Sequence, residues 1–215
     1  MKLFLTSSTI TSELVEPFEK LIGKGIRGLK VAFIPDASFG VSDIKDISWV
    51  EEEKQFLIDT YDWDVTSIVL KDLKKVTLDI FEGYDAIFVN GGFSGYLAKE
   101  MRRTGFDKVL PELLNKGIVY VGSSAGSMVI SKTQDASSWY INEPEPEAIN
   151  IPGLGYIDFQ IYPHIKPELV EQIRKLRDPN LSYYLLKDGE AISVTNDRVI
   201  IHGNNVKHLP KATQT

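Results

Sequence analysis

Val119-Tyr-Val-Gly-Ser-Ser-Ala-Gly-Ser-Met128 is a stretch in which a run of apolar residues passes directly into glycines and serines. Its first half is typical of a buried strand, which we expect to span Ile118–Gly122. Its second half has two readings. Either the chain makes a tight turn that needs little side chain, or it holds a serine at the end of the strand as a nucleophile.

Apolar runs like this one recur along the chain and alternate with segments of helical length. Strands are expected over Leu3–Thr6, Leu29–Pro35, Val65–Leu70 and Asp85–Asn90. Helices are expected between them, over Ser12–Leu21, Ile44–Tyr61, Gly95–Arg103 and Asp107–Asn115. Runs such as Val31–Ile34 and Ala86–Val89 are continuously apolar, which is typical of parallel strands covered on both faces.

The alternation weakens after Gly117. Further elements are expected there: strands over Ile157–Tyr162, Tyr183–Leu186, Ala191–Thr195 and Arg198–His202, and a helix over Lys166–Leu176. Asn196-Asp197 separates the last two strands and indicates a hairpin. We therefore predict one domain over residues 1–215 with an α/β fold: three αβα layers, a mostly parallel doubly wound sheet and a C-terminal antiparallel hairpin. Ligands of such sheets bind at the carboxyl ends of the strands.

The composition of the chain excludes several kinds of functional site and partner. The chain has 215 residues and no cysteine, which removes disulfides, thiolate metal sites and a cysteine nucleophile. The net charge of −6 is modest and spread along the chain, so no nucleic-acid partner is expected. The apolar start, Met1–Leu5, is too short for a signal peptide or a membrane span. We expect a soluble cytoplasmic protein without a membrane partner, a metal or a cofactor.

The serine turn matches the pattern G-x-S-x-G. Gly122-Ser-Ser-Ala-Gly126 follows the expected strand and precedes a helix-compatible segment, which is the context of a nucleophile elbow. Ser124 would sit on the sharp turn with its hydroxyl pointing away from the sheet. The alternative is a plain turn that cradles an anion at a helix N-terminus.

A serine nucleophile needs a base and an orienting carboxylate. The chain has only three histidines, His164, His202 and His208. His164 ends the strand-like run Asp158–Tyr162, at the same edge of the sheet as the serine turn, and is the expected base. Carboxylates that are candidates for the third position lie in the long segment Gln134–Pro152: Asp135, Glu143, Glu145 and Glu147.

A second glycine turn offers an oxyanion hole. The strand Asp85–Asn90 ends in Asn90-Gly-Gly-Phe-Ser94, where glycines let the backbone approach a substrate. We expect the N–H groups of Gly92 and Ala125 to be the donors, and Gly91 and Phe93 to contact the substrate. A glycine turn that only leads into the next helix is the alternative.

Four stretches together resemble the peptidase E (aspartyl dipeptidase) family of serine peptidases, which also includes cyanophycinases. They are Leu3–Ser8, Val89–Gly92, Gly122–Gly126 and Tyr162-Pro-His164. The resemblance covers roughly Leu3 to Asn204. It implies a fold like that of class I glutamine amidotransferases, flavodoxin-like in its sheet, with serine in place of their cysteine.

The resemblance also implies roles for individual residues. Ser124 would be the nucleophile and His164 the base. The family's acid lies between them and is often followed closely by proline, so Asn142-Glu143-Pro144 makes Glu143 the expected acid, with Asp135 as the second choice.

Two departures from the family concern specificity. Phe93 replaces a polar residue of the second glycine turn. The longer arginine-bearing segment that binds an N-terminal aspartate is missing after His164, although Lys166, Arg174 and Arg177 remain as cations. The hydrolase activity therefore transfers better than the aspartate preference.

We expect a serine peptidase that hydrolyses short peptides, as a dipeptidase does, through a Ser-His-Glu/Asp triad. A homodimer is left open. One alternative is a cyanophycinase-like or other amide hydrolase. The alternative of another class is a non-catalytic flavodoxin-like protein that binds a small molecule or an anion.

Overall fold

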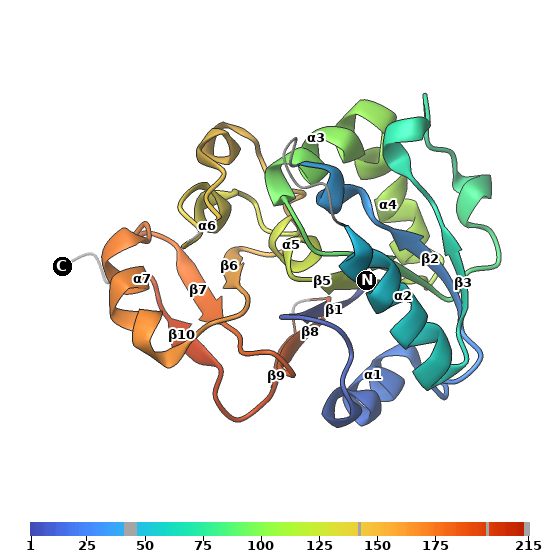
Figure 1. Ribbon diagram of the computed structural model, residues 1–215, viewed down its shortest axis with the longest axis horizontal. Coiled ribbons are helices and arrows are strands. Elements are labelled where there is room, and N and C mark those ends of the chain that lie inside the picture. Colours follow the sequence, from blue (N-terminus) through green and yellow to red (C-terminus); the bar gives the residue numbers. More distant parts are fainter. Residues whose placement is uncertain (41–46, 142, 197, 213–215) are drawn as a thin grey trace.

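The computed structural model describes residues 1–40, 47–141, 143–196 and 198–212. In this part of the chain, a seven-stranded sheet has the order β3-β2-β4-β5-β1-β8-β9. Its strands are β1 (Lys2–Thr6), β2 (Lys30–Ile34), β3 (Asp64–Ser67), β4 (Ala86–Val89), β5 (Val119–Ser123), β8 (Ala191–Thr195) and β9 (Arg198–His202). The first five are parallel, and β8 and β9 continue the sheet antiparallel beyond β1 (Figure 1).

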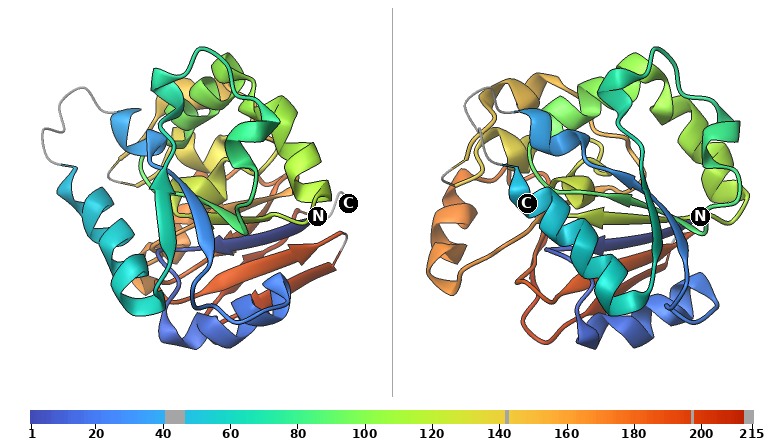
Figure 2. Two further views of the ribbon diagram at one scale, coloured as in Figure 1. Left: turned by 90° about the vertical axis from the view of Figure 1, so that its right-hand side faces the viewer. Right: turned by 45° about the vertical axis from the view of Figure 1, so that its right-hand side comes forward.

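Helices cover both faces of this sheet. One face is covered by α1 (Val15–Ile22) and α2 (Ser48–Tyr61), and the other by α3 (Ser94–Thr104), α4 (Phe106–Asn115) and the short α5 (Ala125–Met128). Figure 2 shows the two layers on opposite sides of the strands. This is the three-layer αβα arrangement that the continuously apolar strands predict.

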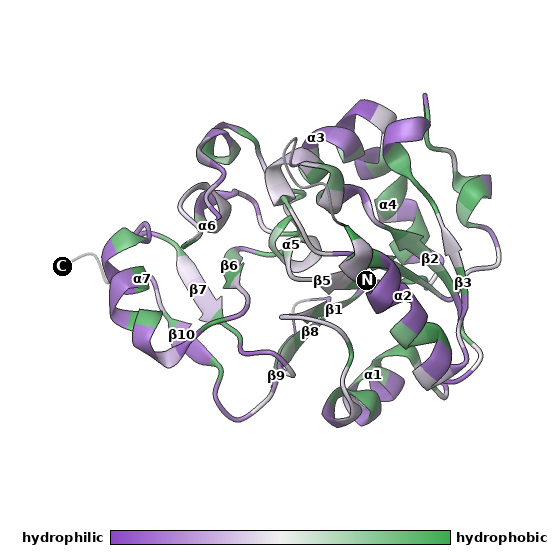
Figure 3. Ribbon diagram, viewed as in Figure 1, coloured by the Kyte–Doolittle hydropathy of each residue, from purple (hydrophilic) through white to green (hydrophobic). Residues whose placement is uncertain are grey.

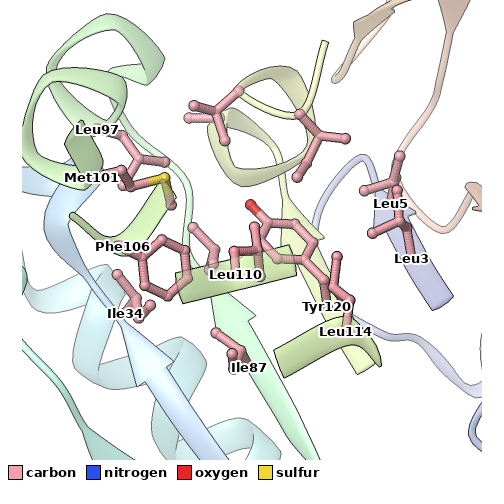
Figure 4. Packing of buried hydrophobic residues seen from close by; sticks show 14 of the residues in the cluster. Leu3, Leu5, Ile34, Ile87, Leu97, Met101, Phe106, Leu110, Leu114 and Tyr120 are labelled. Carbon is pink, nitrogen blue, oxygen red and sulfur yellow. The ribbon is translucent and has the colours of Figure 1, made fainter. Parts of the chain in front are cut away.

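Successive side chains of a strand enter opposite cores. Phe4 points toward α1, where its ring lies 5.2 Å from that of Phe18, whereas Leu3 and Leu5 face the other layer with α4 and Tyr120 (Figure 4). All four residues of β4 are buried, as a central parallel strand requires. Each large apolar side chain fully buried here contributes about 1.5–3 kcal/mol. The helices keep their polar residues on the outer surface (Figure 3).

A second, smaller sheet lies beside the first. It has the order β10-β7-β6, with β6 (Phe159–Tyr162) parallel to β7 (Ser182–Leu185) and β10 (Lys207–Leu209) antiparallel to it. This sheet, with α7 (Val170–Leu176), occupies the left of Figure 1, next to α6 (Asp135–Ser138). It matters for the site because His164 follows β6.

The predicted fold class is confirmed: a mostly parallel doubly wound sheet with an antiparallel C-terminal hairpin, β8–β9. Three details differ from the sequence-based expectation. The strand expected over Val65–Leu70 ends at Ser67, and a 3₁₀ turn takes up Leu70–Asp72. The helix expected from Ile44 starts at Ser48, and residues 44–46 lie outside the described part of the chain. Finally, β6 and β7 form a sheet of their own, because the hairpin occupies the edge of the central sheet next to β1.

Candidate active site

Ser124 stands on the turn between β5 and α5 in an unusual backbone conformation. Its φ of 49° and ψ of −109° lie outside the regions that a residue other than glycine normally adopts. Such a conformation costs of order 1–3 kcal/mol and persists only where the surroundings enforce it. The turn thereby lifts the Ser124 side chain out of the sheet and into a cavity at the carboxyl ends of the strands.

The surroundings of the turn enforce it through close backbone contacts. The Ser124 N–H donates to the Thr6 carbonyl at 3.2 Å, and the Tyr120 hydroxyl donates to the Gly126 carbonyl at 2.7 Å. A β-carbon on Gly126 would lie 2.1 Å from the Val89 carbonyl oxygen, so α5 can approach β4 only where residue 126 is glycine. The motif's second glycine is therefore a packing requirement.

His164 lies directly opposite the serine. Its Nε2 is 3.0 Å from the Ser124 Oγ, across 40 residues of sequence. The histidine follows β6 with a left-handed φ of 53°, and its backbone N–H donates to the Ser7 hydroxyl at 2.7 Å. The Tyr140 hydroxyl donates to the preceding carbonyl, that of Pro163, at 3.0 Å. These contacts fix the backbone position from which the imidazole side chain extends. The structure thus brings together Ser124 and His164, the two residues expected to react.

The other ring nitrogen of His164 contacts Asp188. Nδ1 is 2.6 Å from the Asp188 Oδ1, and this contact holds the pKa of the Asp188 carboxyl below its usual range. Ser7 Oγ also lies 3.0 Å from that oxygen. With Asp188 ionised, Nδ1 carries the proton and Nε2 is left free to accept one from Ser124. The residues thus form a chain Ser124–His164–Asp188.

The carboxylates expected in this position lie elsewhere. Glu143 is exposed at the rim of the cavity, where its backbone N–H donates to the Tyr140 carbonyl at 3.2 Å. Asp135 accepts hydrogen bonds from Trp139 Nε1, at 2.8 Å, and from the Tyr183 hydroxyl. Neither carboxylate contacts His164 among the described residues. The segment between serine and histidine packs over the second sheet instead, and this directs Asp135 into an aromatic cluster.

Glu145 has a different position again. Its two carboxylate oxygens accept the N–H groups of Ser94 and Gly95, at 2.8 and 2.9 Å, at the start of α3. A carboxylate there satisfies unpaired helix donors and interacts favourably with the helix dipole. Glu145 therefore ties the long loop to the glycine turn on which Phe93 lies.

The expected oxyanion donors border the same cavity. Among the described residues, the N–H groups of Gly92 and Ala125 have no hydrogen-bond partner, whereas that of Gly91 donates to Asn90 Oδ1 at 2.6 Å. Gly92 has a φ of 127°, and a β-carbon there would lie 2.4 Å from the Ala37 carbonyl. A β-carbon on Gly91 would lie 3.2 Å from that of Ser124. Gly91 thus keeps space open beside the serine, and Gly92 allows the turn to pack against the Ala37 backbone.

The cavity over Ser124 has a volume of about 440 Å³, within the range of small-molecule sites, about 300–1,000 Å³. Apolar and aromatic side chains form much of its wall: Trp49, Phe56, Phe93, Met128 and Tyr140. Phe93, expected to contact the substrate, therefore lines the cavity together with Gly91.

Glu53, a residue of α2, also faces the cavity. Its carboxylate lies 3.2 Å from the Ser123 hydroxyl, beside the turn that holds Ser124. Burial raises its pKa to about 7, against the opposing influence of hydroxyl contacts and of His164. No local pattern singles out this residue, since Glu51, Glu52 and Glu53 are consecutive and only the helix face distinguishes them.

Across residues 1–40, 47–141, 143–196 and 198–212, no group of three His, Asp or Glu side chains is placed to hold a metal ion. In the same part of the chain, no helix combines the length and the apolar character needed to cross a bilayer.

The sequence contains only a weak signal for Asp188, its position between two strands. Lys187-Asp-Gly-Glu190 follows a strand and precedes another, so its aspartate lies at a strand end like Ser124 and His164. The sequence-based prediction places the acid between the serine and the histidine, whereas Asp188 comes after both. Ser7 directly follows β1 and therefore also lies at a strand end.

Comparison with known proteins gives a consistent result. The family model described as peptidase family S51 matches residues 3–202. An uncharacterized peptidase of Listeria monocytogenes is 27% identical over 210 residues, covering 92% of this chain and 96% of the relative. Peptidase E of Streptomyces coelicolor is 29% identical over 136 residues, covering 58% of this chain and 55% of the relative. The crystal structure of a candidate peptidase E from L. monocytogenes EGD-e superposes with a TM-score of 0.70 at 25% identity, covering 97% of this chain and 98% of that one.

Proposed function

We propose that this chain, which belongs to peptidase family S51 and is therefore a peptidase, is a serine-type enzyme that hydrolyses short peptides. The observation that carries the proposal is the chain of contacts from Ser124 through His164 to Asp188, at 3.0 and 2.6 Å. Serine, imidazole and carboxylate in this order are the arrangement required for activating a hydroxyl.

In the proposed reaction, Ser124 Oγ attacks the carbonyl carbon of the scissile amide while its proton moves to His164 Nε2. The N–H groups of Gly92 and Ala125 stabilise the negative charge that develops on the carbonyl oxygen. His164 then gives the proton to the leaving amine, which departs and leaves an acyl ester on Ser124. A water molecule, deprotonated by His164, hydrolyses this ester and regenerates the serine.

Asp188 orients the imidazole and stabilises its charged form. This role differs from our sequence-based expectation, which placed Glu143 there. The exposed rim position of Glu143 supports a contact with the substrate or with solvent instead. Ser7 supports the same geometry, because its hydroxyl accepts the His164 N–H and lies beside Asp188.

Short peptides are the proposed substrates because the cavity is of small-ligand size and the long loop bounds it. Its volume is about 440 Å³, and Ser137, Tyr140 and Glu145 of that loop line one side. A long polypeptide would need an open groove on both sides of the serine. The same reasoning covers other small amides, so a broader amide hydrolase is the alternative that the substrate test separates.

The test is a panel of dipeptides, tripeptides and an unfolded protein, incubated with the wild-type chain and with Ser124→Ala. We expect products from the shortest peptides, a rate lower by about 10⁴-fold or more in Ser124→Ala, and no cleavage of the protein. Equal turnover by both forms would contradict the proposal. Cleavage of non-peptide amides alone would assign the amide hydrolase instead.

A further inference from the structure

The cavity over Ser124 is acidic. Apart from Tyr140, its titratable side chains are Glu53, Glu143, Glu145 and His164, and no lysine or arginine lines it among the described residues. Two of the three carboxylates are accounted for, because Glu145 accepts two helix N–H groups and Glu143 is exposed to solvent. Glu53 remains as a partly buried carboxylate that no lysine or arginine among the described residues pairs with.

Helix α2 directs Glu53 inward together with two aromatic residues. Trp49, Glu53 and Phe56 are spaced four and three residues apart, which places them on one face of the helix, and all three line the cavity. The flanking lysine does not neutralise this face. Lys54 points away and pairs with Glu51 at 2.7 Å.

Both the carboxylate and the rings favour the same kind of ligand. Placing an anion in a partly apolar wall is costly unless a cation pairs with it. Trp49 and Phe56 are 38% and 39% exposed, so part of their surfaces is open to a ligand. Aromatic faces attract ammonium groups, and a carboxylate between two rings therefore selects an organic cation.

We propose that Glu53 binds an ammonium group of the substrate between Trp49 and Phe56 and thereby determines which peptides reach Ser124. The inference rests on the proposed peptidase function and adds the charge of the substrate to it. The ammonium group can come from two sources, the free N-terminus of the peptide or a lysine-like side chain of its first residue. In either case, an acidic first residue is disfavoured.

Two pairs of peptides separate these sources. Ala-Leu and N-acetyl-Ala-Leu differ in the terminal ammonium, and Lys-Leu and norleucyl-Leu differ in the side-chain ammonium. Each is assayed for kcat/KM with the wild-type enzyme, with Glu53→Gln and with Glu52→Gln. Glu52 is an exposed neighbour on the same helix that does not line the cavity, which makes it the matched control.

A charge-assisted contact of this kind is worth about 10- to 100-fold in kcat/KM. We expect the wild type to prefer the charged member of at least one pair by that factor. The preference should fall to about 3-fold or less in Glu53→Gln and stay unchanged in Glu52→Gln. The pair that responds identifies the source of the ammonium group. A preference absent from both pairs, or one that survives in Glu53→Gln, would overturn the inference.

Binding to the inactive Ser124→Ala variant separates this inference from the proposed function. Calorimetry compares its affinity for the same four peptides, with and without the added Glu53→Gln change. Loss of charge discrimination on adding Glu53→Gln would support the inference even if the wild type hydrolysed no peptide. The inference would be refuted, and the peptidase function left intact, by two results together. The wild type would hydrolyse charged and uncharged peptides at equal rates, and Ser124→Ala would bind them with equal affinity.

Discussion

His164 Nδ1 lies 2.6 Å from Asp188 Oδ1, although β7 and 24 residues of sequence separate the two side chains. The contact exists because two strand ends of different sheets meet: His164 follows β6, and Asp188 lies in the turn before β8. Ser7, at the end of β1, stands between them. Three separate strand ends thus converge on one imidazole.

Asp188→Asn should lower kcat by about 10²- to 10⁴-fold, because an amide favours the wrong imidazole tautomer and cannot stabilise its charge. Glu143→Gln should change kcat by no more than about 3-fold, since Glu143 lies at the exposed rim. Steady-state kinetics on one short peptide compares the two. If Glu143→Gln proved the more damaging variant, the acid assigned from the sequence would be right and Asp188 wrong.

Ser7→Ala should impair the site through the histidine. The change removes the acceptor of the His164 N–H, at 2.7 Å, and leaves that group unpaired. We expect kcat to fall by about 10-fold at nearly constant KM, and the free energy of unfolding to fall by about 1–2 kcal/mol.

Ser7→Thr is the control for this prediction, since it keeps the hydroxyl. It should restore most of kcat. If kcat were unaffected in Ser7→Ala, or if Ser7→Thr were as impaired as Ser7→Ala, the hydroxyl would have no positioning role.

Gly126→Ala should destabilise the protein by about 3 kcal/mol or more, as strained substitutions in packed regions do. Its added methyl group would lie 2.1 Å from the Val89 carbonyl oxygen and force α5 away from β4. Gly25→Ala is the comparison, because there the nearest atom is a side-chain oxygen at 3.8 Å. Urea denaturation measures both. Similar midpoints for the two variants would show that the elbow tolerates the displacement.

Glu53→Gln should stabilise the protein, and the gain should depend on pH. The pKa of Glu53 is raised from 4.5 to about 7, so the folded state holds a proton that the unfolded chain has already released. The free energy of unfolding of the wild type therefore falls as the pH rises from about 4.5 through about 7, because the folded protein must then ionise Glu53. We expect Glu53→Gln to be more stable than the wild type by about 1–3 kcal/mol at pH 8, and by much less at pH 4.5.

Glu52→Gln serves as the control in the same denaturation series, and its stability should follow that of the wild type at both pH values. A difference between Glu53→Gln and the wild type that stays constant from pH 4.5 to 8 would mean that Glu53 ionises as readily in the folded state as in the unfolded one. A residue that costs stability and faces the cavity is what a binding role predicts.

The sequence predicts those features of the fold and the site that have a local signal. Continuous apolar strands predicted the parallel sheet, and the glycines around Ser124 and the strand before His164 indicated the sheet edge where they meet. Residues whose role depends on how distant segments pack together have no such local signal. Asp188 reaches His164 where the end of β6, in the second sheet, meets the turn before β8 of the central sheet, and Glu53 differs from Glu52 only in the face of α2 that it occupies.

Covalent labelling shows whether Ser124 is an activated nucleophile. A fluorophosphonate reacts with a serine whose proton has an adjacent base, and mass spectrometry of the digested protein locates the adduct. We expect one adduct, on Ser124, that forms in the wild type, is absent in Ser124→Ala and forms more slowly, by about 10²-fold or more, in Asp188→Asn. An adduct on Ser123 or Ser127, or no labelling of a folded wild-type chain, would contradict this expectation.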